Sequence, residues 1–387
     1  NWYQHSLLMT PVDAFDTFTF LGMKDAASEA KELILSRLDF NADQSVQVFE
    51  TTIRLLAALQ TAYELDGDQR FLLYAKDLGN RLMPAFNSPT GMPYRFVNLK
   101  TGKTKDSISN PAEIGTLVLE FGKLSQLTGN PRYYEVAKKA SLEIFKRCSK
   151  IGLPGSTIDV NTGEWKDPES HISGGIDSYY EYLLKCAILF DDADCKKMWQ
   201  DSIVAINKYL ADEVRGELWY GHADMNTGKR GATKYGALDA FFPAVLALDG
   251  DLERAKRLQD SGFKMWTKHG IEPEEFDYQK QEVTYPSYPL RPEIVESAYY
   301  LYHYTGDEKY LQMGKQMFED TVKYCKTDVA YTGLKSVVTK EKNDYMHSFF
   351  FAETLKYYYL LFSPPKTLDF KKTIFNTEAH PIKKTWK

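Results

Sequence analysis

One glutamate lies inside an apolar segment, where a charged side chain is costly to bury. Glu50 interrupts the segment SVQVFETTIRLLAAL, and Phe49, Ile53 and Leu56 indicate that its helix is largely buried. An ion pair with Arg54, four residues later, would explain Glu50 structurally and stabilise the helix by a few tenths of a kcal/mol. A lone charge on a buried face costs free energy, however, so a functional role is the alternative explanation for Glu50. Both interpretations of Glu50, structural and functional, remain open at this point.

Two further segments place acids at the start of apolar helices. Asp177 precedes SYYEYLLKCAILF, where an N-cap would explain it. Glu293 and Glu296 are three residues apart and therefore share a helix face, directly after Pro292, which suits a first helical turn. Acids there also favour the helix dipole. Two acids on one face beside Arg291 are nevertheless more than a helix start needs.

Glu353 and Glu113 complete the set of acids in apolar surroundings. Glu353 interrupts FFFAETLKYYYLLF, with Lys356 as its simplest partner, and Glu113 lies in NPAEIGTLVLEF. Several inward acids on successive helices predict a cavity lined by carboxylates. Paired carboxylates with different pKa values hydrolyse glycosides, and clustered oxygen ligands hold a hard cation such as Ca²⁺. The sequence contains no GxSxG, HExxH, P-loop or dinucleotide-binding motif that would favour another chemistry.

The elements that position these acids repeat along the chain. Apolar-periodic helices end at Gly-Asp or Gly-Asn, and a second periodic helix follows, as at Gly67, Gly129 and Gly306. Glycine supplies the left-handed residue after a helix, and Asp or Asn caps the next helix. Six such turns predict twelve helices, and the segment Met346–Phe362 adds a thirteenth. The repeat therefore predicts an all-α array of helical hairpins in which either the last helix is solitary or its partner would precede Asn1.

Four long segments between the hairpins are rich in Gly, Pro, Ser and Thr. They are Asn87–Ser109, Gly152–Gly175, Tyr220–Tyr235 and Glu272–Pro292. Loops at one end of a helical array commonly carry function. The alternation in 157–165 also predicts a short β-ribbon. Since no shift in composition divides the chain, we expect one domain over residues 1–387.

Composition excludes several other classes of protein. A net charge of −5 and a pI of about 5.9 argue against a nucleic-acid partner. We expect no membrane span, since the apolar runs are short, and no signal peptide, with Asn1 starting a mature or trimmed chain. The four cysteines show neither zinc-ligand spacing nor a disulfide scaffold. Aromatic residues are 14% of the chain, which is typical of a thick helical core and also compatible with a sugar-binding groove.

Seven motifs in order along the chain resemble glycoside hydrolase family 47, the class I α-1,2-mannosidases. Beyond PVDAFDT at residues 11–17, they are VFETTIR, FNSPTGMPY, AEIGTLVLEF, GGIDSYYEYLLK, LRPEIVES, SFFFAETLKYYYLLF and FNTEAHP. The resemblance implies an (αα)7 barrel with small β-ribbons in its loops and a C-terminal tail that plugs the floor and helps to bind one Ca²⁺. Seven hairpins need fourteen helices, so the family's first helix is expected to be absent from this chain.

The resemblance also implies a role for each matching residue. Glu50 is the expected general acid and Glu293 the expected general base, while Asp177 positions water or substrate or acts as the base. Glu274 is the fourth expected catalytic residue, and Thr377 is the expected calcium ligand through its carbonyl and hydroxyl oxygens. The expected substrate-binding residues, some acting through the waters of the calcium, are Asp16, Glu113, Glu296, Phe349, Glu353 and Glu378.

The implied activity is a Ca²⁺-dependent, inverting exo-α-1,2-mannosidase that acts on mannose-rich oligosaccharides or N-glycans. The alternative is a lectin-like or degradation factor that binds mannose glycans with weak catalysis. Gly175, at a position where processing enzymes carry Arg, resembles the ER degradation-enhancing mannosidase-like branch, and His347 replaces a usual Glu. We expect a monomer that is secreted or periplasmic if bacterial and located in the endoplasmic reticulum lumen or secretory pathway if eukaryotic. Another helical-toroid family, 76 or 92, is disfavoured by the FNTEAHP tail.

Overall fold

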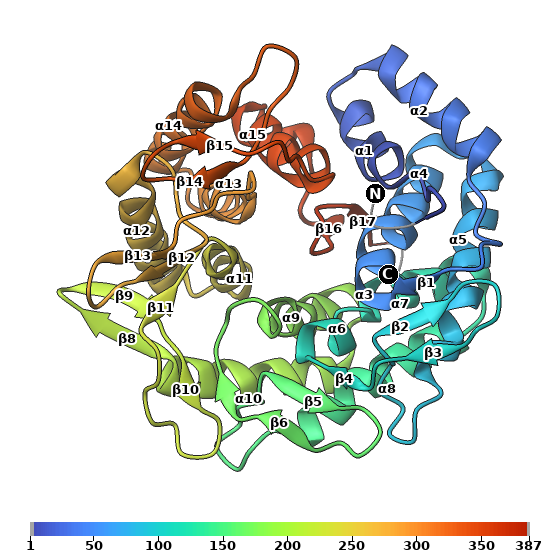
Figure 1. Ribbon diagram of the computed structural model, residues 1–387, viewed down its shortest axis with the longest axis horizontal. Helices are drawn as coiled ribbons and strands as arrows, with labels where there is room; N and C mark the ends of the chain where they lie inside the picture. Colours follow the sequence, from blue (N-terminus) through green and yellow to red (C-terminus); the bar gives the residue numbers. More distant parts are fainter. Residues whose placement is uncertain (1–3, 385–387) are drawn as a thin grey trace.

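The computed structural model describes residues 4–384 and forms a ring of helices around a central opening (Figure 1). The inner wall is made of α1 (Met9–Phe20), α3 (Val48–Glu50) with η1 (Thr51–Leu56) and α4 (Ala57–Asp66), α6 (Pro111–Gly115) with α7 (Val118–Thr128), α9 (Asp177–Phe190), η3 (Leu238–Phe241) with α11 (Phe242–Asp249), α13 (Glu293–Thr305), and η4 (Phe350–Thr354) with α15 (Leu355–Phe362). The outer wall is made of α2 (Lys24–Arg37), α5 (Gln69–Leu82), α8 (Arg132–Lys146), α10 (Ala193–Tyr209), α12 (Leu252–His269) and α14 (Glu308–Cys325). Short 3₁₀ turns η2 (Met83–Phe86) and η5 (Pro365–Thr367) lie in the connections.

The hairpin array predicted from the sequence is confirmed. Within residues 4–384, seven inner walls alternate with six outer helices, so the last inner helix, α15, is solitary. The ring closes because η4 packs on α1 while α15 packs on α13 and α14. Each inner wall thereby presents one end to the same central space.

Local capping forms the turns of the hairpins. Gly67 and Gly306 follow α4 and α13 with φ of 82° and 67°, in the left-handed region that glycine adopts without strain. The next residues, Asp68 and Asp307, accept hydrogen bonds from the backbone N–H groups of Arg70 and Lys309 and so cap α5 and α14. These are the residues on which the predicted repeat rests.

The inner helices are buried on nearly all sides, and many large aromatic side chains are buried in the helices and in the loop ribbons. In the described chain, the largest fully buried side chains are those of two Trp and ten Tyr residues. Trp219, for example, stacks on Tyr278 with ring centroids 5.4 Å apart. The high aromatic content therefore mainly builds the core. No helix in residues 4–384 combines the length and the apolar character needed to cross a bilayer.

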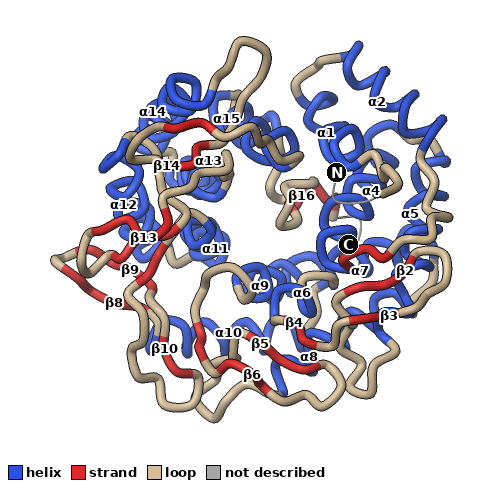
Figure 2. Tube along the Cα trace, in the orientation of Figure 1, coloured by secondary structure: helices blue, strands red, loops and turns tan. Residues whose placement is uncertain are grey.

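Within residues 4–384, short antiparallel ribbons form in the segments between helices and in the C-terminal tail, and none of their sheets has more than three strands (Figure 2). The strands are β1 (Ser45–Gln47), β2 (Phe96–Asn98), β3 (Thr104–Lys105), β4 (Ile108–Ser109), β5 (Thr157–Asp159), β6 (Trp165–Asp167), β7 (Glu169–Ser170), β8 (Ala211–Val214), β9 (Glu217–Tyr220), β10 (Ala223–Asp224), β11 (Lys234–Tyr235), β12 (Glu275–Asp277), β13 (Glu282–Tyr285), β14 (Leu334–Ser336), β15 (Glu341–Lys342), β16 (Thr373–Phe375) and β17 (Pro381–Lys383). The ribbon predicted in 157–165 corresponds to β5 and β6.

The C-terminal segment forms a hairpin, β16–β17, that turns back into the ring (Figure 1). The buried side chain of Asn376 holds the turn together, because its oxygen accepts hydrogen bonds from the backbone N–H groups of Glu378 and His380. Its amide nitrogen donates to the carbonyl oxygen of Ile53 and to Glu120, both on the inner wall. The predicted plug at the barrel floor is therefore present.

A disulfide joins Cys186 in α9 to Cys195 in α10, with the Cα atoms 5.9 Å apart. The sequence analysis, which found no disulfide scaffold, is wrong on this pair. The two residues look unremarkable in sequence because nine positions separate them. The hairpin turn at Asp191 and Asp192 brings the end of one helix beside the start of the next and aligns both side chains.

Candidate active site

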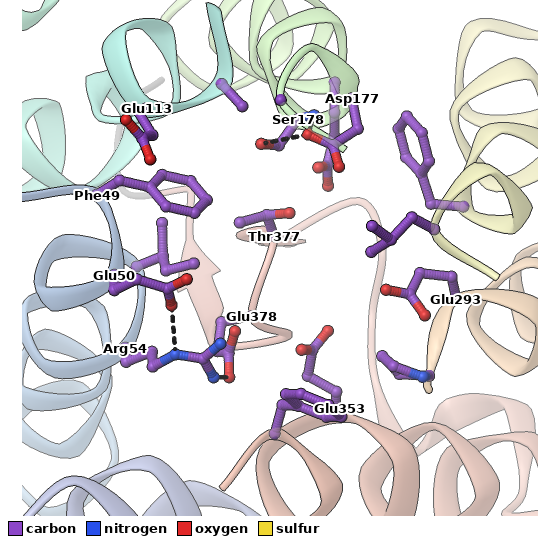
Figure 3. Close-up of a pocket in the computed structure, with 18 of the residues that line it drawn as sticks. Phe49, Glu50, Arg54, Glu113, Asp177, Ser178, Glu293, Glu353, Thr377 and Glu378 are labelled. Carbon is purple, nitrogen blue, oxygen red and sulfur yellow. Dashed lines mark hydrogen bonds and ion pairs between the residues drawn. The ribbon is translucent and has the colours of Figure 1, made fainter. Parts of the chain in front are cut away.

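The central opening holds a pocket of about 430 Å³ lined by acids from the inner helices and by the C-terminal turn (Figure 3). All but two of the predicted site residues line this pocket. They are Glu50, Glu113, Asp177, Glu293, Glu296, Phe349, Glu353, Thr377 and Glu378. Residues more than 300 positions apart in sequence thus face one another across a single cavity.

Arg54 organises one side of the pocket. Its buried guanidinium donates from Nε to Glu50 at 2.8 Å and from Nη1 to Glu378, and Nη1 lies 3.5 Å from Asp13. Burial opposes this charge, but the three carboxylates outweigh it and raise the Arg54 pKa further. The structural interpretation of Glu50 as a partner of Arg54 is confirmed, and the same carboxylate also lines the cavity. The two interpretations are therefore not exclusive.

A π-helical turn follows Glu50 directly. The segment η1 (Thr51–Leu56) widens the helix where it borders the pocket, and a second π-helical turn, η4, contains Glu353. Such turns commonly occur at functional sites because they change the direction of one side chain without ending the helix. Both π-helical turns in the described chain thus lie beside a pocket acid.

Glu293 begins α13 on the opposite side of the pocket from Glu50 (Figure 3). Burial raises its pKa to about 7, and its Oε2 atom has no hydrogen-bond partner in residues 4–384. The preceding turn is strained, since Leu290, a bulky residue, has a φ of 70°. Thr354 stabilises that turn by donating to the Leu290 carbonyl oxygen at 2.8 Å. The chain thus holds an unpaired carboxyl group at a defined position over the cavity.

Asp177 is the first residue of α9, but it does not cap that helix as the simplest interpretation proposed. Ile176 occupies the N-cap position, and Asp177 accepts a hydrogen bond from the N–H of Ser178. Burial raises the pKa of Asp177 to about 7. The neighbouring Gly175 has a φ of 94°, in the left-handed region that glycine adopts without strain.

Three buried acids crowd the floor around Thr377. Burial raises the pKa values of Glu296 and Glu378 to about 8 and that of Glu353 well above its ordinary range. The nearby charge of Glu378 raises the Glu353 pKa further. Tyr357 donates to Glu296 at 3.0 Å, and Arg54 pairs with Glu378 but also with Glu50, so the three carboxyl groups are only partly balanced. Such a cluster either keeps protons or attracts a cation.

Thr377 lies between these acids and the two side walls (Figure 3). Its backbone N–H donates to the Tyr182 hydroxyl at 3.2 Å, and that hydroxyl donates to Glu120 at 2.6 Å. These hydrogen bonds attach the turn between β16 and β17 to α9 and α7. Its own oxygens remain on the side of the pocket that the acids share.

Phe349 and Glu113 occupy the rim. The guanidinium groups of Arg54 and Arg291 lie 5.7 and 5.5 Å from the Phe349 ring centroid, and His347 stacks on the same ring at 4.7 Å. Cation–π contact on an aromatic ring holds its orientation. Glu113 accepts from Gln47, Arg95 and Ser109. Both side chains are thus held in place by their neighbours where they line the pocket.

Asp16 and Glu274 are the predicted site residues that do not line the pocket. Asp16 is buried behind the floor, where Lys356 lies 2.9 Å and His380 3.0 Å away. Lys356 is therefore the partner of Asp16 and not of Glu353, against the simplest interpretation of that helix. Glu274 makes a bidentate ion pair with Arg291 at 2.6 and 3.0 Å.

Besides Arg54, which was expected only as the partner of Glu50, three charged residues line the pocket that were not predicted as site residues. Arg95 and Arg291 come from loops, and Glu181 comes from α9. Glu181 lies four positions after Asp177 and hence on the same helix face, which is a signal that could have identified it. The arginines lack such a signal, because loop residues have no periodic pattern.

The comparisons with known proteins agree with this architecture. The sequence profile of Glycosyl hydrolase family 47 matches residues 2–384. The chain belongs to glycosyl hydrolase family 47. As a family 47 protein it is a glycoside hydrolase with the (αα)7 barrel, and the resemblance found in the sequence is confirmed.

Among family 47 relatives, alpha-mannosidase I MNS5 of Arabidopsis thaliana is 37% identical over 97% of this chain and 67% of that protein. ER degradation-enhancing alpha-mannosidase-like protein 2 of Homo sapiens is 35% identical over 97% of this chain and 71% of that protein. Mannosyl-oligosaccharide 1,2-alpha-mannosidase IB of Homo sapiens is 36% identical over 96% of this chain and 62% of that protein. The chain thus spans about two thirds of these relatives.

Among solved structures, the alpha-1,2-mannosidase from Trichoderma reesei superposes with a TM-score of 0.88 at 28% identity, covering 97% of this chain and 90% of that one. A family 76 glycoside hydrolase from a Bacteroides thetaiotaomicron strain gives a TM-score of 0.54 at 12% identity over 81% of this chain and 68% of that one, a likeness of fold alone. The preference for family 47 over another helical toroid is confirmed.

Proposed function

We propose that this family 47 chain is an inverting exo-α-1,2-mannosidase that depends on Ca²⁺ and removes terminal α-1,2-linked mannose from mannose-rich glycans. The observation that carries the proposal is the arrangement of Glu50 and Glu293 on opposite sides of one pocket, with Thr377 between them (Figure 3). An inverting glycosidase needs an acid and a base that are far enough apart to admit a water molecule.

Glu293 suits the role of the base. Its carboxyl group has no hydrogen-bond partner on Oε2 in the described chain, and its pKa of about 7 makes it able to accept a proton near neutral pH. Glu50, held by Arg54 on the facing wall, donates a proton to the glycosidic oxygen as the leaving sugar departs. Asp177, beside Ser178, orients the water or the substrate from a third side.

The donor set fits calcium. Ca²⁺ prefers oxygen ligands, and Thr377 offers a carbonyl and a hydroxyl oxygen beside the buried acids Glu296, Glu353 and Glu378, of which only Glu378 forms an ion pair within residues 4–384, with Arg54. Glu296, Glu353 and Glu378 would hold the waters that complete the coordination shell, because a single threonine supplies too few ligands. The bound ion would supply charge that orients sugar hydroxyl groups and favours ionised carboxylates around it.

The substrate class follows from the pocket shape and from the relatives. The plug formed by the C-terminal hairpin closes the cavity, which favours one terminal sugar and hence exo-action. Two of the relatives are named as 1,2-alpha-mannosidases, which supports an α-1,2-linked mannose at this position. The Cys186–Cys195 disulfide favours a secreted location or the secretory pathway, since disulfides persist in oxidising compartments. We keep the expectation of a monomer.

The test is hydrolysis of α-1,2-, α-1,3- and α-1,6-linked mannobiose with saturating Ca²⁺, followed by proton NMR of the first product. We expect preferential cleavage of the α-1,2 linkage and release of β-mannose. An α-configured first product would mean retention and contradict the assignment of Glu293 as base. Binding of α-1,2-mannobiose without turnover would instead support the lectin-like alternative.

A further inference from the structure

A cluster of two histidines and one glutamate lies in the loops outside the pocket. β7 (Glu169–Ser170) pairs with β10 (Ala223–Asp224) in antiparallel register, with Ser170 opposite Ala223. The same register places His171 opposite His222, and Glu169 lies two positions before His171 and hence on the same face. The histidine ring centroids are 4.5 Å apart. None of the three residues lines the candidate active site.

The Nδ1 atoms of both histidines are buried and lack a hydrogen bond within residues 4–384. His171 is 7% exposed, and its Nδ1 atom has no hydrogen-bond partner in residues 4–384. The Nδ1 atom of His222 lies 2.9 Å from Glu169 Oε1 but is likewise without a well-directed hydrogen bond. Buried polar atoms nearly always have partners, so two buried ring nitrogens without a hydrogen bond need an explanation.

A transition-metal ion explains all three groups. One potential ligand atom from each of Glu169, His171 and His222 lies within 4.8 Å of the other two. In a tetrahedral zinc site with bonds of about 2.0–2.1 Å, ligand atoms are roughly 3.3 Å apart, so small side-chain rotations would close the site. Two imidazole nitrogens and one carboxylate oxygen form a ligand set that suits Zn²⁺, whereas Ca²⁺ prefers oxygen ligands alone.

We propose that Glu169, His171 and His222 bind one Zn²⁺ ion that fastens two loops together. His171 begins the loop that connects β7 to α9, and His222 lies in the connection between β9 and β10. Asp177 follows His171 by six residues, and its backbone N–H donates to the Ser173 carbonyl oxygen at 3.0 Å in the turn between them. The ion therefore stabilises the loop that leads into Asp177. This site does not depend on the proposed mannosidase activity.

The experiment measures metal binding by the full chain with saturating Ca²⁺, so that oxygen-ligand sites are already filled. Metal-stripped protein is titrated with Co²⁺, whose visible absorption reports tetrahedral nitrogen and oxygen ligands, and then with Zn²⁺ by calorimetry. The variants are Glu169→Gln and His222→Gln. Their matched controls are Glu164→Gln, an exposed acid of the same loop, and His5→Gln, an exposed histidine elsewhere.

We expect one equivalent of Co²⁺ to bind, to be displaced by Zn²⁺, and to raise the thermal midpoint of the wild type. Each cluster variant should weaken binding at least about 10-fold, since even partners of metal ligands commonly contribute that much. The two controls should bind as the wild type does. Because the Glu169 side chain is 42% exposed, Glu169→Gln should fold even if His222→Gln does not, and far-UV circular dichroism verifies this. Absence of binding in folded wild type, or equal binding in Glu169→Gln, would overturn the proposal.

Discussion

At the scale of single residues, the carboxyl groups of the pocket differ in whether a cationic side chain balances their charge. Arg54 is in contact with Glu50 and Glu378 and lies 3.5 Å from Asp13, so one guanidinium group balances the carboxylates on this side of the pocket. Glu293 on the facing wall has no such partner on Oε2, and its pKa is raised to about 7. The raised pKa of Glu293 by itself favours the protonated form below pH 7, so its proposed role as base relies on the positive charge that the proposed calcium ion would supply.

The first prediction concerns these two carboxyl groups. Glu293→Gln and Glu50→Gln should each lower kcat by about two to four powers of ten, the usual contribution of a general base or acid. Binding of the disaccharide should survive in both variants, because the amide keeps the shape of the carboxyl group. Steady-state kinetics and calorimetry measure the two effects, with Glu164→Gln as a control. Near-wild-type kcat in Glu293→Gln would remove Glu293 from the mechanism.

At the scale of elements, the C-terminal hairpin holds the floor of the barrel. His380 lies between Asp13 and Asp16, with nitrogen–oxygen distances of 3.0 Å to each, and Lys356 donates to both Asp16 and the carbonyl oxygen of Ala379. These contacts join α1, α15 and the tail. The hairpin is therefore part of the packed core, and its Thr377 is held firmly enough to act as a ligand.

The second prediction concerns the pH dependence of stability. Burial opposes the charge on His380, but Asp16 and Asp13 outweigh it and raise the His380 pKa to about 9. A histidine whose folded pKa exceeds its unfolded value of about 6.5 contributes fully below pH 6.5 and loses that contribution as the pH rises through 9. Urea unfolding of wild type and His380→Gln should therefore differ most below pH 6.5 and converge toward pH 9. A difference that grows with pH would contradict this.

The third prediction concerns calcium. Thr377→Val removes one proposed ligand oxygen while keeping side-chain shape, so it should abolish Ca²⁺-dependent activity and leave the helical far-UV signal unchanged. Thr367→Val, in η5 outside the pocket, is the control and should behave like the wild type. Full activity in Thr377→Val, or in wild type shown to be free of metal, would refute the calcium proposal.

At the scale of the whole molecule, the ring is held by hairpins that pack side by side and by a few contacts between distant segments. The closing contact joins η4 to α1, more than 300 residues away in sequence. Within one hairpin, the Cys186–Cys195 disulfide fixes α9 to α10. Since α9 carries Asp177 and Glu181 to the pocket, the stability of this hairpin bears directly on the site.

The fourth prediction concerns the disulfide. Cys195→Ser should lower the free energy of unfolding by about 2–3 kcal/mol, the value expected for a crosslink that closes a loop of this length. Cys148→Ser is the control, because Cys148 is a free thiol in the neighbouring helical layer. Denaturant unfolding measures both. Equal stability of Cys195→Ser and wild type under oxidising conditions would show that the crosslink does not stabilise the fold.

Much of the fold could be predicted from the sequence, because interactions between neighbouring residues determine it. Helix ends are fixed by neighbours, as with Gly67 and Asp68, so the hairpin repeat could be predicted, with a solitary last helix as one of two alternatives. Acids such as Glu50 and Glu353 stand out because burial of a charge is costly anywhere in a core. The family motifs then supplied the order of the barrel and an expected role for each residue.

Only the tertiary structure decided which distant groups meet. Asp16 pairs with His380, 364 positions away, and so lies behind the floor instead of in the pocket. Arg54 reaches Glu378 across 324 positions, and Arg291 holds Glu274 by two hydrogen bonds. Such pairings depend on how the ring closes, so they produce no periodic pattern in the sequence. Helix caps act within a few residues and are visible in sequence, whereas charge balance in a closed core is a property of the complete fold.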